Sequence, residues 1–142
     1  SLGCTVQMIE RSSIVVALLE DGLTRASQDP DLSAIIRRMS LQHGDASDIL
    51  QATSEASRPD VIYLDPMYPP TAKSAQKGKA MHFFHAIIGN NGDTEKLLES
   101  ALQTAKERVV VKRPLKAKSI GNDPVNSSIR GKTTRFDIYP IR

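Results

Sequence analysis

The sequence from residue 60 to residue 70 reads DVIYLDPMYPP, an apolar run that ends at an acid and continues into prolines. Residues 60–64 have the β-branched and aromatic bias of a buried strand. Pro66 lacks the amide proton that a strand ladder needs, so the strand is predicted to end at Asp65. Proline fixes its own φ and restricts the residue before it, so Asp65 and the chain up to Tyr68 have few conformations. A stiff loop of this kind suits a site that positions groups, and it equally suits a tight structural turn.

Strand-like and helix-like segments alternate along the rest of the chain. The predicted strands cover residues 4–9, 39–43, 60–64, 108–112 and 135–141. The predicted helices cover residues 13–26, 31–38, 81–88 and 94–106, with a helical segment after Gly44. Strands separated by helices of ten or more residues indicate a parallel, doubly wound α/β sheet. The short turn around Gly131 predicts an antiparallel hairpin at one edge of that sheet.

Capping residues and apolar spacing set the predicted helix and strand ends. Ser12 or Ser13 is expected to cap the first helix, and Asp31 is expected near the start of the second. The apolar face of the first helix is predicted to hold Ile14, Ala17, Leu18, Leu19 and Leu23. The helix at 94–106 is predicted to bury Leu97, Leu98, Ala101 and Leu102. Pro114 is expected to stop the strand at 108–112.

Composition indicates one cytoplasmic domain with an uneven charge distribution. The 142 residues contain one cysteine, Cys4, and no apolar run near the roughly 20 residues needed to cross a bilayer. Residues 106–142 carry ten Lys or Arg against three Asp or Glu, a net charge of +7. The other 105 residues carry nine against thirteen, a net charge of −4. The basic third predicts a surface for a polyanion, and a solvated face without a partner is the alternative.

Three acids follow predicted strands, at the end of the sheet where α/β proteins bind ligands. They are Glu10, Asp45 and Asp65. A carboxylate in the position of Glu10 can accept both ribose hydroxyl protons of a nucleotide, and Asp45 can accept from an adenine amino group. The alternative for each acid is that it caps the helix or turn that follows. Because all three close a strand, in order along the chain, the ligand-binding interpretation is favoured.

The loop motif resembles that of a known enzyme class. Asp65-Pro66-Met67-Tyr68 is similar to the Asp-Pro-Pro-Tyr motif of S-adenosyl-L-methionine-dependent methyltransferases that modify exocyclic amino groups. LDPMYPP at 64–70, VVVKRP at 109–114 and RFDIY at 135–139 together resemble the J family of bacterial small-subunit ribosomal RNA methyltransferases, which act on guanine N2. The likeness runs over essentially the whole chain. It implies a Rossmann-like class I methyltransferase sheet, mostly parallel, with an antiparallel edge hairpin at the C-terminus.

The resemblance also implies that part of such a domain lies outside these residues. Enzymes of this class carry a glycine-rich loop after the first strand, and no two of the eight glycines here are separated by one residue. Residues 1–142 are therefore expected to form the C-terminal part of one methyltransferase domain, without its first strand and glycine loop. The resemblance assigns cofactor binding to Glu10, Arg11, Asp45 and Asp65.

The implied reaction assigns the catalytic and RNA-binding residues. The Asp65 carboxylate and the Pro66 carbonyl can accept the two N–H protons of a guanine N2 amine, and Tyr68 can stack on the base. The expected partner is 16S ribosomal RNA or the 30S subunit, contacted by Lys73, Lys77, Lys112, Arg113 and Arg135. Adenine N6, a protein glutamine amide and a non-catalytic RNA-binding module are the alternatives. No metal is expected, because His82 and His85 have no acidic or cysteine partner placed with them.

Overall fold

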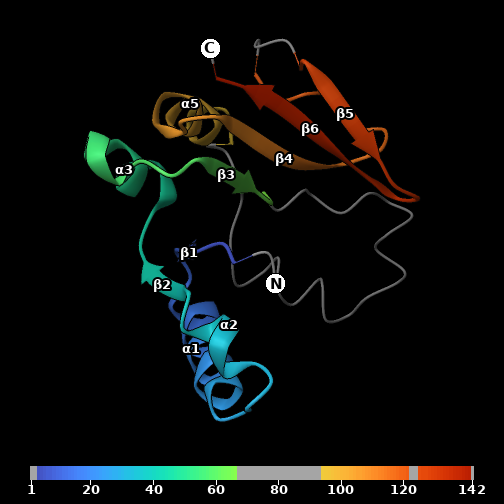
Figure 1. Ribbon diagram of the computed structural model, residues 1–142. Coiled ribbons are helices and arrows are strands. Elements are labelled where there is room, and N and C mark those ends of the chain that lie inside the picture. The colour runs from blue at the N-terminus through green and yellow to red at the C-terminus, as the bar shows by residue number, and fades with distance from the viewer. Residues whose placement is uncertain (1–2, 67–93, 122–124, 142) are drawn as a thin grey trace. The chain divides into compact units, whose positions relative to one another are not determined.

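The structure is a computed structural model that describes residues 3–66, 94–121 and 125–141 (Figure 1). Contacts divide the chain into two units, Ser1–Ile49 and Leu50–Arg142. Their strands pair into two sheets, one with β1 and β2 and one with the order β3-β4-β6-β5. No helix in the described ranges is long and apolar enough to span a membrane. The predicted helix at 81–88 lies outside the described residues.

The first unit is a parallel β-α-β arrangement. Strand β1 (Val6–Glu10) leads into helix α1 (Ser13–Ser27), and a short helix α2 (Ser33–Ile36) precedes strand β2 (Met39–His43). The two strands pair in parallel from Val6 opposite Met39 to Glu10 opposite His43. Both strands therefore end at the same edge, as the alternation of strand and helix patterns predicted.

Helix α1 begins at its predicted cap but buries a different face. Ser12 is the N-cap, as predicted. Val16 is buried, whereas Ile14 is 53% and Leu18 is 58% exposed. Ala17 is exposed as well, so the predicted apolar face is wrong for these three residues. Val16 lies about 200° around the helix from Ile14 and from Leu18, because successive residues advance by about 100°. Helix α1 is contacted by β1, β2 and α2. These elements cover the side of the helix that holds Val16.

Helix α2 is shorter than predicted, and Asp31 does not cap it. The N-cap position is Leu32, without a side-chain hydrogen bond. Asp29 instead accepts the turn's amide protons, from Asp31 to its carboxylate at 2.8 Å and from Ser33 to its carbonyl at 2.8 Å. The acidic residue two positions earlier therefore organises this turn.

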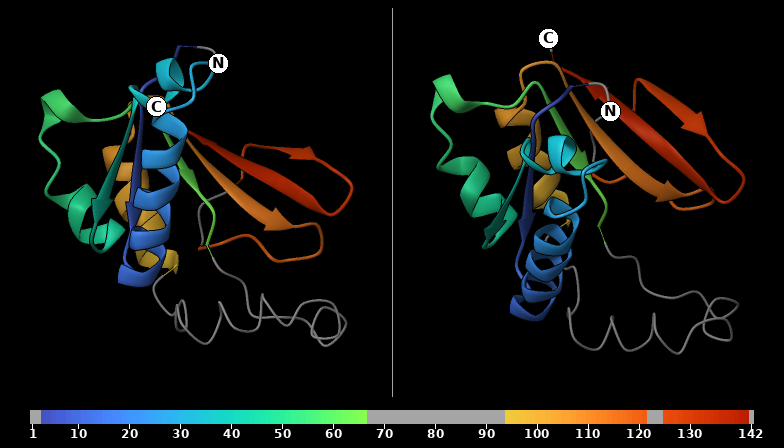
Figure 2. Two further views of the ribbon diagram at one scale, coloured as in Figure 1. Left: turned by 90° about the horizontal axis from the view of Figure 1, so that it is seen from below. Right: turned by 60° about the horizontal axis from the view of Figure 1, so that its bottom comes forward.

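The second unit packs one helix on a four-stranded sheet. Helix α3 (Ala46–Gln51) and a 3₁₀ turn η1 (Glu55–Ser57) lead to strand β3 (Val61–Leu64). Helix α5 (Thr94–Thr104) precedes strand β4 (Arg108–Pro114), and the hairpin of β5 (Ser127–Arg130) and β6 (Thr134–Pro140) follows. Strands β3 and β4 are parallel, and β6 is antiparallel to both β4 and β5 (Figure 2). The predicted edge hairpin is confirmed.

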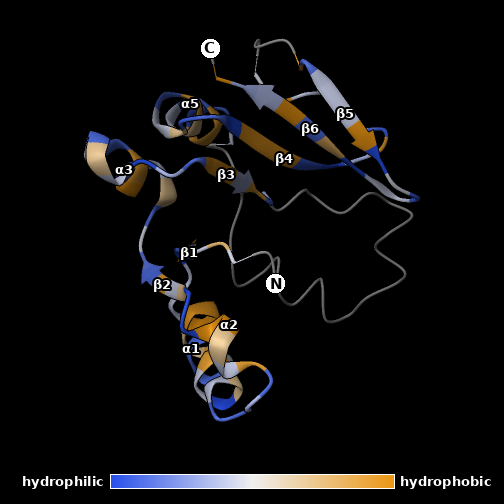
Figure 3. Ribbon diagram, in the orientation of Figure 1, coloured by the Kyte–Doolittle hydropathy of each residue, from blue (hydrophilic) through white to orange (hydrophobic). Residues whose placement is uncertain are grey.

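The core of the second unit lies between α5 and one face of this sheet. Alternate residues of β3 and β4 are buried, and β4 is hydrophobic along its middle (Figure 3). The predicted inward residues Leu98 and Ala101 are 2% and 0% exposed. The buried cluster comprises Leu50, Ile62, Leu64, Leu98, Ala101, Ala105, Val109, Val111, Ile120 and Tyr139. Burying a leucine of this kind contributes about 1.5–3 kcal/mol.

Strand β4 extends two residues beyond its predicted end at Lys112. Its last residue is Pro114, which lies opposite Thr134 of β6. Proline removes only its own amide donor, while its carbonyl still accepts a hydrogen bond, here from the Ala117 amide at 3.1 Å. The extension places Arg113 within the sheet rather than in a loop after it.

Candidate active site

The strand ends of the first unit bring Glu10, Arg11 and Asp45 to one edge. Glu10 lies opposite His43, and the Gly44 amide donates to the Glu10 carbonyl at 3.0 Å. A ring nitrogen of His43 lies 3.1 Å from the Arg11 carbonyl oxygen. The two parallel strands therefore place these residues, which the sequence predicted, side by side. They lie at the carboxyl end of the strands, where α/β sheets bind ligands.

Each acid at this edge also holds a backbone amide. A Glu10 carboxylate oxygen accepts from the Ser12 amide at 2.7 Å, and an Asp45 carboxylate oxygen accepts from the Ser47 amide at 2.9 Å. The capping role considered from the sequence is thus present at both positions. The same Asp45 oxygen also accepts from the Asp48 amide at 3.4 Å. A carboxylate offers about four acceptor sites, so these amides do not exhaust either group. The caps orient both carboxylates and leave them able to accept further protons.

Gly44 makes the turn from β2 to Asp45 possible. Its φ is +154°, and an added Cβ would lie 2.9 Å from the Ile49 side chain. A side chain at this position would therefore clash with the helix that Asp45 starts.

In the second unit, Asp65 is joined to the neighbouring strand. Leu64 lies opposite Val111, so the next residues along the two parallel strands are Asp65 and Lys112. The Lys112 ammonium donates to the Asp65 carboxylate at 2.7 Å. The Lys112 and Asp65 side chains are 37% and 49% exposed. A pair this exposed contributes about 0–1 kcal/mol to stability, so the carboxylate can interact with a ligand at little structural cost.

The same pair sets the electrostatics of a third residue, Tyr63, which the sequence reasoning did not single out. The hydrogen bond with Asp65 raises the pKa of Lys112, which keeps the ammonium charged. Burial, followed by the charge of Asp65, raises the pKa of Tyr63. Period-two alternation along β3 would have identified Tyr63, because it lies two residues before Asp65.

The remaining residues of the quoted motif are described only in part. Pro66 is buried, directly after the exposed Asp65. Tyr68, Lys73 and Lys77, predicted to stack on the base or bind RNA, lie outside the described residues. Within the described ranges, no group of three or more His, Cys, Asp or Glu side chains could hold a metal ion.

Arg113 and Arg135, both predicted to bind RNA, are engaged inside the fold. Arg135 donates twice to Asp137, at 2.8 and 3.0 Å, and Ser128 donates to the same carboxylate at 2.6 Å. Arg113 is 8% exposed and donates to the Lys118 carbonyl. Burial alone would raise the pKa of Asp137, but hydrogen bonds from Arg135 and Ser128 and the Arg113 charge lower it. Their contact with RNA stays a prediction, and the fold gives both arginines a structural role.

The chain matches a known protein family over almost its whole length. A family model described as "Putative SAM-dependent methyltransferase" matches residues 1–141. The chain belongs to this family. The methyltransferase match runs through both units, and it confirms the fold class that the sequence predicted.

Curated relatives of this methyltransferase chain share a ribosomal name. It is 52% identical over 139 residues to "Ribosomal RNA small subunit methyltransferase J" of Thioalkalivibrio sulfidiphilus, covering 98% of the chain and 54% of that protein. It is 49% identical over 141 residues to the protein of that name from Dechloromonas aromatica, covering 99% of the chain and 57% of the relative. These matches confirm the resemblance drawn from the three sequence blocks. The chain spans about half the length of these relatives.

Solved structures agree on the methyltransferase fold. The crystal structure of a SAM-dependent methyltransferase from Neisseria gonorrhoeae matches with a TM-score of 0.78 and 38% identity, covering 98% of this chain and 53% of that one. An rRNA methyltransferase from Streptomyces viridochromogenes matches with a TM-score of 0.54 and 14% identity, covering 96% of this chain and 66% of that one. The second likeness concerns the fold alone.

Proposed function

We propose that the protein transfers a methyl group from S-adenosyl-L-methionine to the exocyclic N2 amine of a guanine in 16S ribosomal RNA, presented on the 30S subunit. The observation that carries the proposal is the Asp65-Pro66 end of β3, where an accessible carboxylate lies beside Lys112 at the ligand edge of the sheet. Family membership and the ribosomal RNA methyltransferases among the relatives support the cofactor and the substrate class. A ribosomal substrate places the protein in the cytoplasm.

The chemical difficulty lies in the amine. The guanine N2 lone pair is delocalised into the ring, so the site must hold the amine and favour a localised lone pair. The Asp65 carboxylate and the Pro66 carbonyl accept the two N–H protons and stabilise the positive charge that develops on nitrogen. The amine lone pair then forms the new N–C bond while the methyl C–S bond breaks onto sulfur. The methylated amine loses its proton to water, so Asp65 need not be a strong base.

Lys112 acts through Asp65. Its ammonium occupies one carboxylate oxygen, Oδ2, and the other oxygen can then accept from the amine. The charged hydrogen bond from Lys112 fixes the Asp65 carboxylate between two parallel strand ends. Lys112 is therefore a positioning residue in this proposal, in addition to its predicted place near RNA.

The residues of the first unit fit the adenosine part of the cofactor. S-adenosyl-L-methionine supplies an electrophilic methyl group when bound. Glu10 accepts from its ribose hydroxyls and Asp45 from its adenine amino group, with Arg11 beside them at the same strand ends. Carboxylates already oriented by backbone amides suit these hydroxyl and amino donors. Asp65 serves both substrates, and Tyr68 stacks on the target base.

The test is a methyl-transfer assay on 30S subunits with the protein as its gene encodes it and with Asp65→Ala. Transfer is expected to fall by about 10²–10³-fold, the typical loss when one such electrostatic contact is removed. Asp60→Ala is the matched control, because Asp60 is an exposed carboxylate just before the same strand. Undiminished transfer by Asp65→Ala would remove Asp65 from the mechanism.

A further inference from the structure

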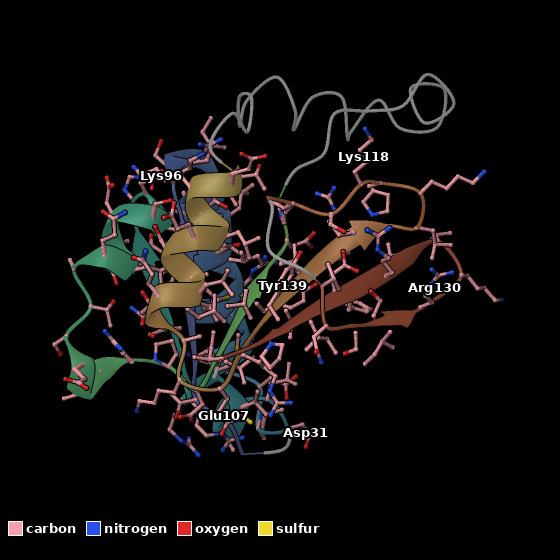
Figure 4. The ribbon with its side chains drawn as sticks, turned by 90° about the horizontal axis from the view of Figure 1, so that it is seen from above. Asp31, Lys96, Glu107, Lys118, Arg130 and Tyr139 are labelled. Carbon is pink, nitrogen blue, oxygen red and sulfur yellow. The ribbon has the colours of Figure 1, made fainter. Side chains whose placement is uncertain are left out.

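Four exposed basic residues lie together where β4 ends and the β5–β6 hairpin turns. Lys116 and Lys118 follow β4, Arg130 is the last residue of β5, and Lys132 lies in the hairpin turn. Figure 4 shows Lys118 and Arg130 away from Glu107, which precedes the start of β4. From Pro114 to Thr134 the sequence has only one acid, Asp123, against these four cations. We call Lys116, Lys118, Arg130 and Lys132 the basic platform.

Strand pairing brings the two halves of the basic platform side by side. Pro114 lies opposite Thr134 in the β4–β6 ladder, and the Leu115 amide donates to the Thr133 carbonyl at 3.4 Å. The loop that carries Lys116 and Lys118 therefore starts against the hairpin turn that carries Lys132. Four cations on two adjacent turns make a surface suited to a chain of phosphates.

The buried Arg113 and the half-buried Arg135 hold the backbone of this loop. Arg135 donates to the Leu115 carbonyl at 2.8 Å, and Arg113 donates to the Lys118 carbonyl. Arg135 is itself fixed by its two bonds to Asp137. The lysine backbones are thus ordered before any ligand binds, which lowers the entropy lost on binding.

The basic platform lies at the same end of the strands as Asp65. Strands β3 and β4 run in parallel, so Asp65 after β3 and the loop after β4 lie at the same end. Lys112, which holds Asp65, lies only two residues before Pro114. A nucleotide strand on the platform would therefore pass beside the group proposed to hold the target amine.

We propose that the basic platform binds backbone phosphates of the RNA strand that carries the methylated base. The identity of that base rests on the proposed function, while the RNA contact itself does not. The sequence predicted that Arg113 and Arg135 contact RNA. In this proposal they hold the loop of the basic platform, and its four exposed cations bind the phosphates. Such contacts position a strand without reading its sequence.

The test compares two variants with equal loss of charge. The platform variant changes four residues to glutamine: Lys116, Lys118, Arg130 and Lys132. The control variant does the same to four exposed basic residues elsewhere in the second unit: Arg58, Lys96, Lys106 and Arg108. Binding of each chain to a short labelled single-stranded RNA is measured by fluorescence anisotropy over a series of KCl concentrations, without methyl donor. Circular dichroism checks that both variants fold.

The platform variant is expected to bind at least about tenfold more weakly at low salt. Log affinity falls as log salt rises, and the platform variant should show a slope that is shallower by about 3. Each phosphate contact on a single strand contributes about 0.7 to this slope, and the variant loses four cations. Equal slopes for the two variants, absence of RNA binding by the unaltered chain, or preferential binding to phosphatidylserine vesicles would each overturn the platform. Normal platform-dependent binding by a protein that transfers no methyl group would overturn the proposed function and leave the platform standing.

Discussion

Two aspartate–cation pairs belong to the four-stranded sheet, and they differ in burial rather than in distance. Asp65 and Lys112 meet at 2.7 Å with side chains that are 49% and 37% exposed. Asp137 and Arg135 meet at 2.8 Å with side chains that are 1% and 11% exposed. Lys112 and Asp137 lie on opposite faces, because Lys112 alternates with Val111, the residue paired with Asp137. In the Asp65–Lys112 pair, called the open pair below, Lys112 donates to Oδ2 and the other oxygen can accept from a ligand. In the Asp137–Arg135 pair, called the closed pair, both carboxylate oxygens already accept from Arg135.

This difference separates function from stability within one sheet. An exposed pair gains little because water screens both charges. A buried pair has lost that water, so removing one partner leaves an uncompensated charge in the interior. Substitutions in the two pairs should therefore give opposite patterns of activity and stability.

The largest effect is expected for Asp65→Asn. The amide keeps the shape but offers a weaker acceptor, and methyl transfer should fall by about 10²–10³-fold. The free energy of unfolding should change by less than about 1 kcal/mol, because the pair is exposed. Transfer rates and urea denaturation of the same protein preparation check both values. A large loss of stability would show that the open pair is structural.

The second effect is the reverse pattern for Asp137→Asn. The free energy of unfolding should fall by about 3 kcal/mol, because Arg135 loses its charged partner in the interior. Methyl transfer per folded molecule at saturating RNA should stay near the unaltered value, because a loosened basic platform weakens RNA binding and not the methyl-transfer step. Urea denaturation measures the first quantity, and transfer rates corrected for the folded fraction measure the second. A stable variant would contradict the structural role of the closed pair.

A smaller effect is expected for Lys112→Gln. Without its ammonium, Asp65 is less firmly positioned, and methyl transfer should fall by about tenfold, equivalent to about 1.4 kcal/mol. Lys112→Arg should recover most of the rate, since it restores a cation for the carboxylate. Stability should be unchanged in both variants. Equal rates for the glutamine and arginine variants would argue against positioning through charge.

The smallest effect is a pH dependence confined to the closed pair. The pKa of Asp137 is lowered in the folded chain, so its stabilisation is complete above its ordinary pKa of 3.8. That stabilisation is lost as pH falls through the lower, folded-state value. The stability difference between the unaltered chain and Asp137→Asn should therefore be constant near neutral pH and shrink below about pH 4. Urea denaturation at a series of pH values measures it, and a difference that grows in acid would contradict this assignment.

Local signals in the sequence were enough for most of the described helices and strands and for the position of the strand-end acids. The apolar run before Asp65 and the proline after it predicted both the strand and its end. Glu10 and Asp45 were likewise predicted at strand ends, and the structure places them at one edge. These features depend on neighbours within a few residues, which a single sequence contains.

The partners of these residues could not be predicted, because they depend on register between distant strands. Lys112 reaches Asp65 only because β3 and β4 pair with Leu64 opposite Val111, across 47 residues of sequence. Arg135 is held in place because Asp137 lies on its face of the sheet, and Ser128 of the adjacent strand donates to the same carboxylate. The sequence therefore predicted RNA contact equally for Lys112, Arg113 and Arg135. In the fold, Lys112 binds Asp65, Arg113 binds the Lys118 carbonyl and Arg135 binds Asp137.

The central claim is that the site around Asp65 methylates guanine N2. The most direct measurement is mass spectrometry of nucleosides from 16S ribosomal RNA after reaction of 30S subunits with the protein as its gene encodes it and S-adenosyl-L-methionine. N2-methylguanosine should appear, and it should be absent with Asp65→Ala. N6-methyladenosine in its place, methylation of protein glutamine only, or no methylated product would contradict the account.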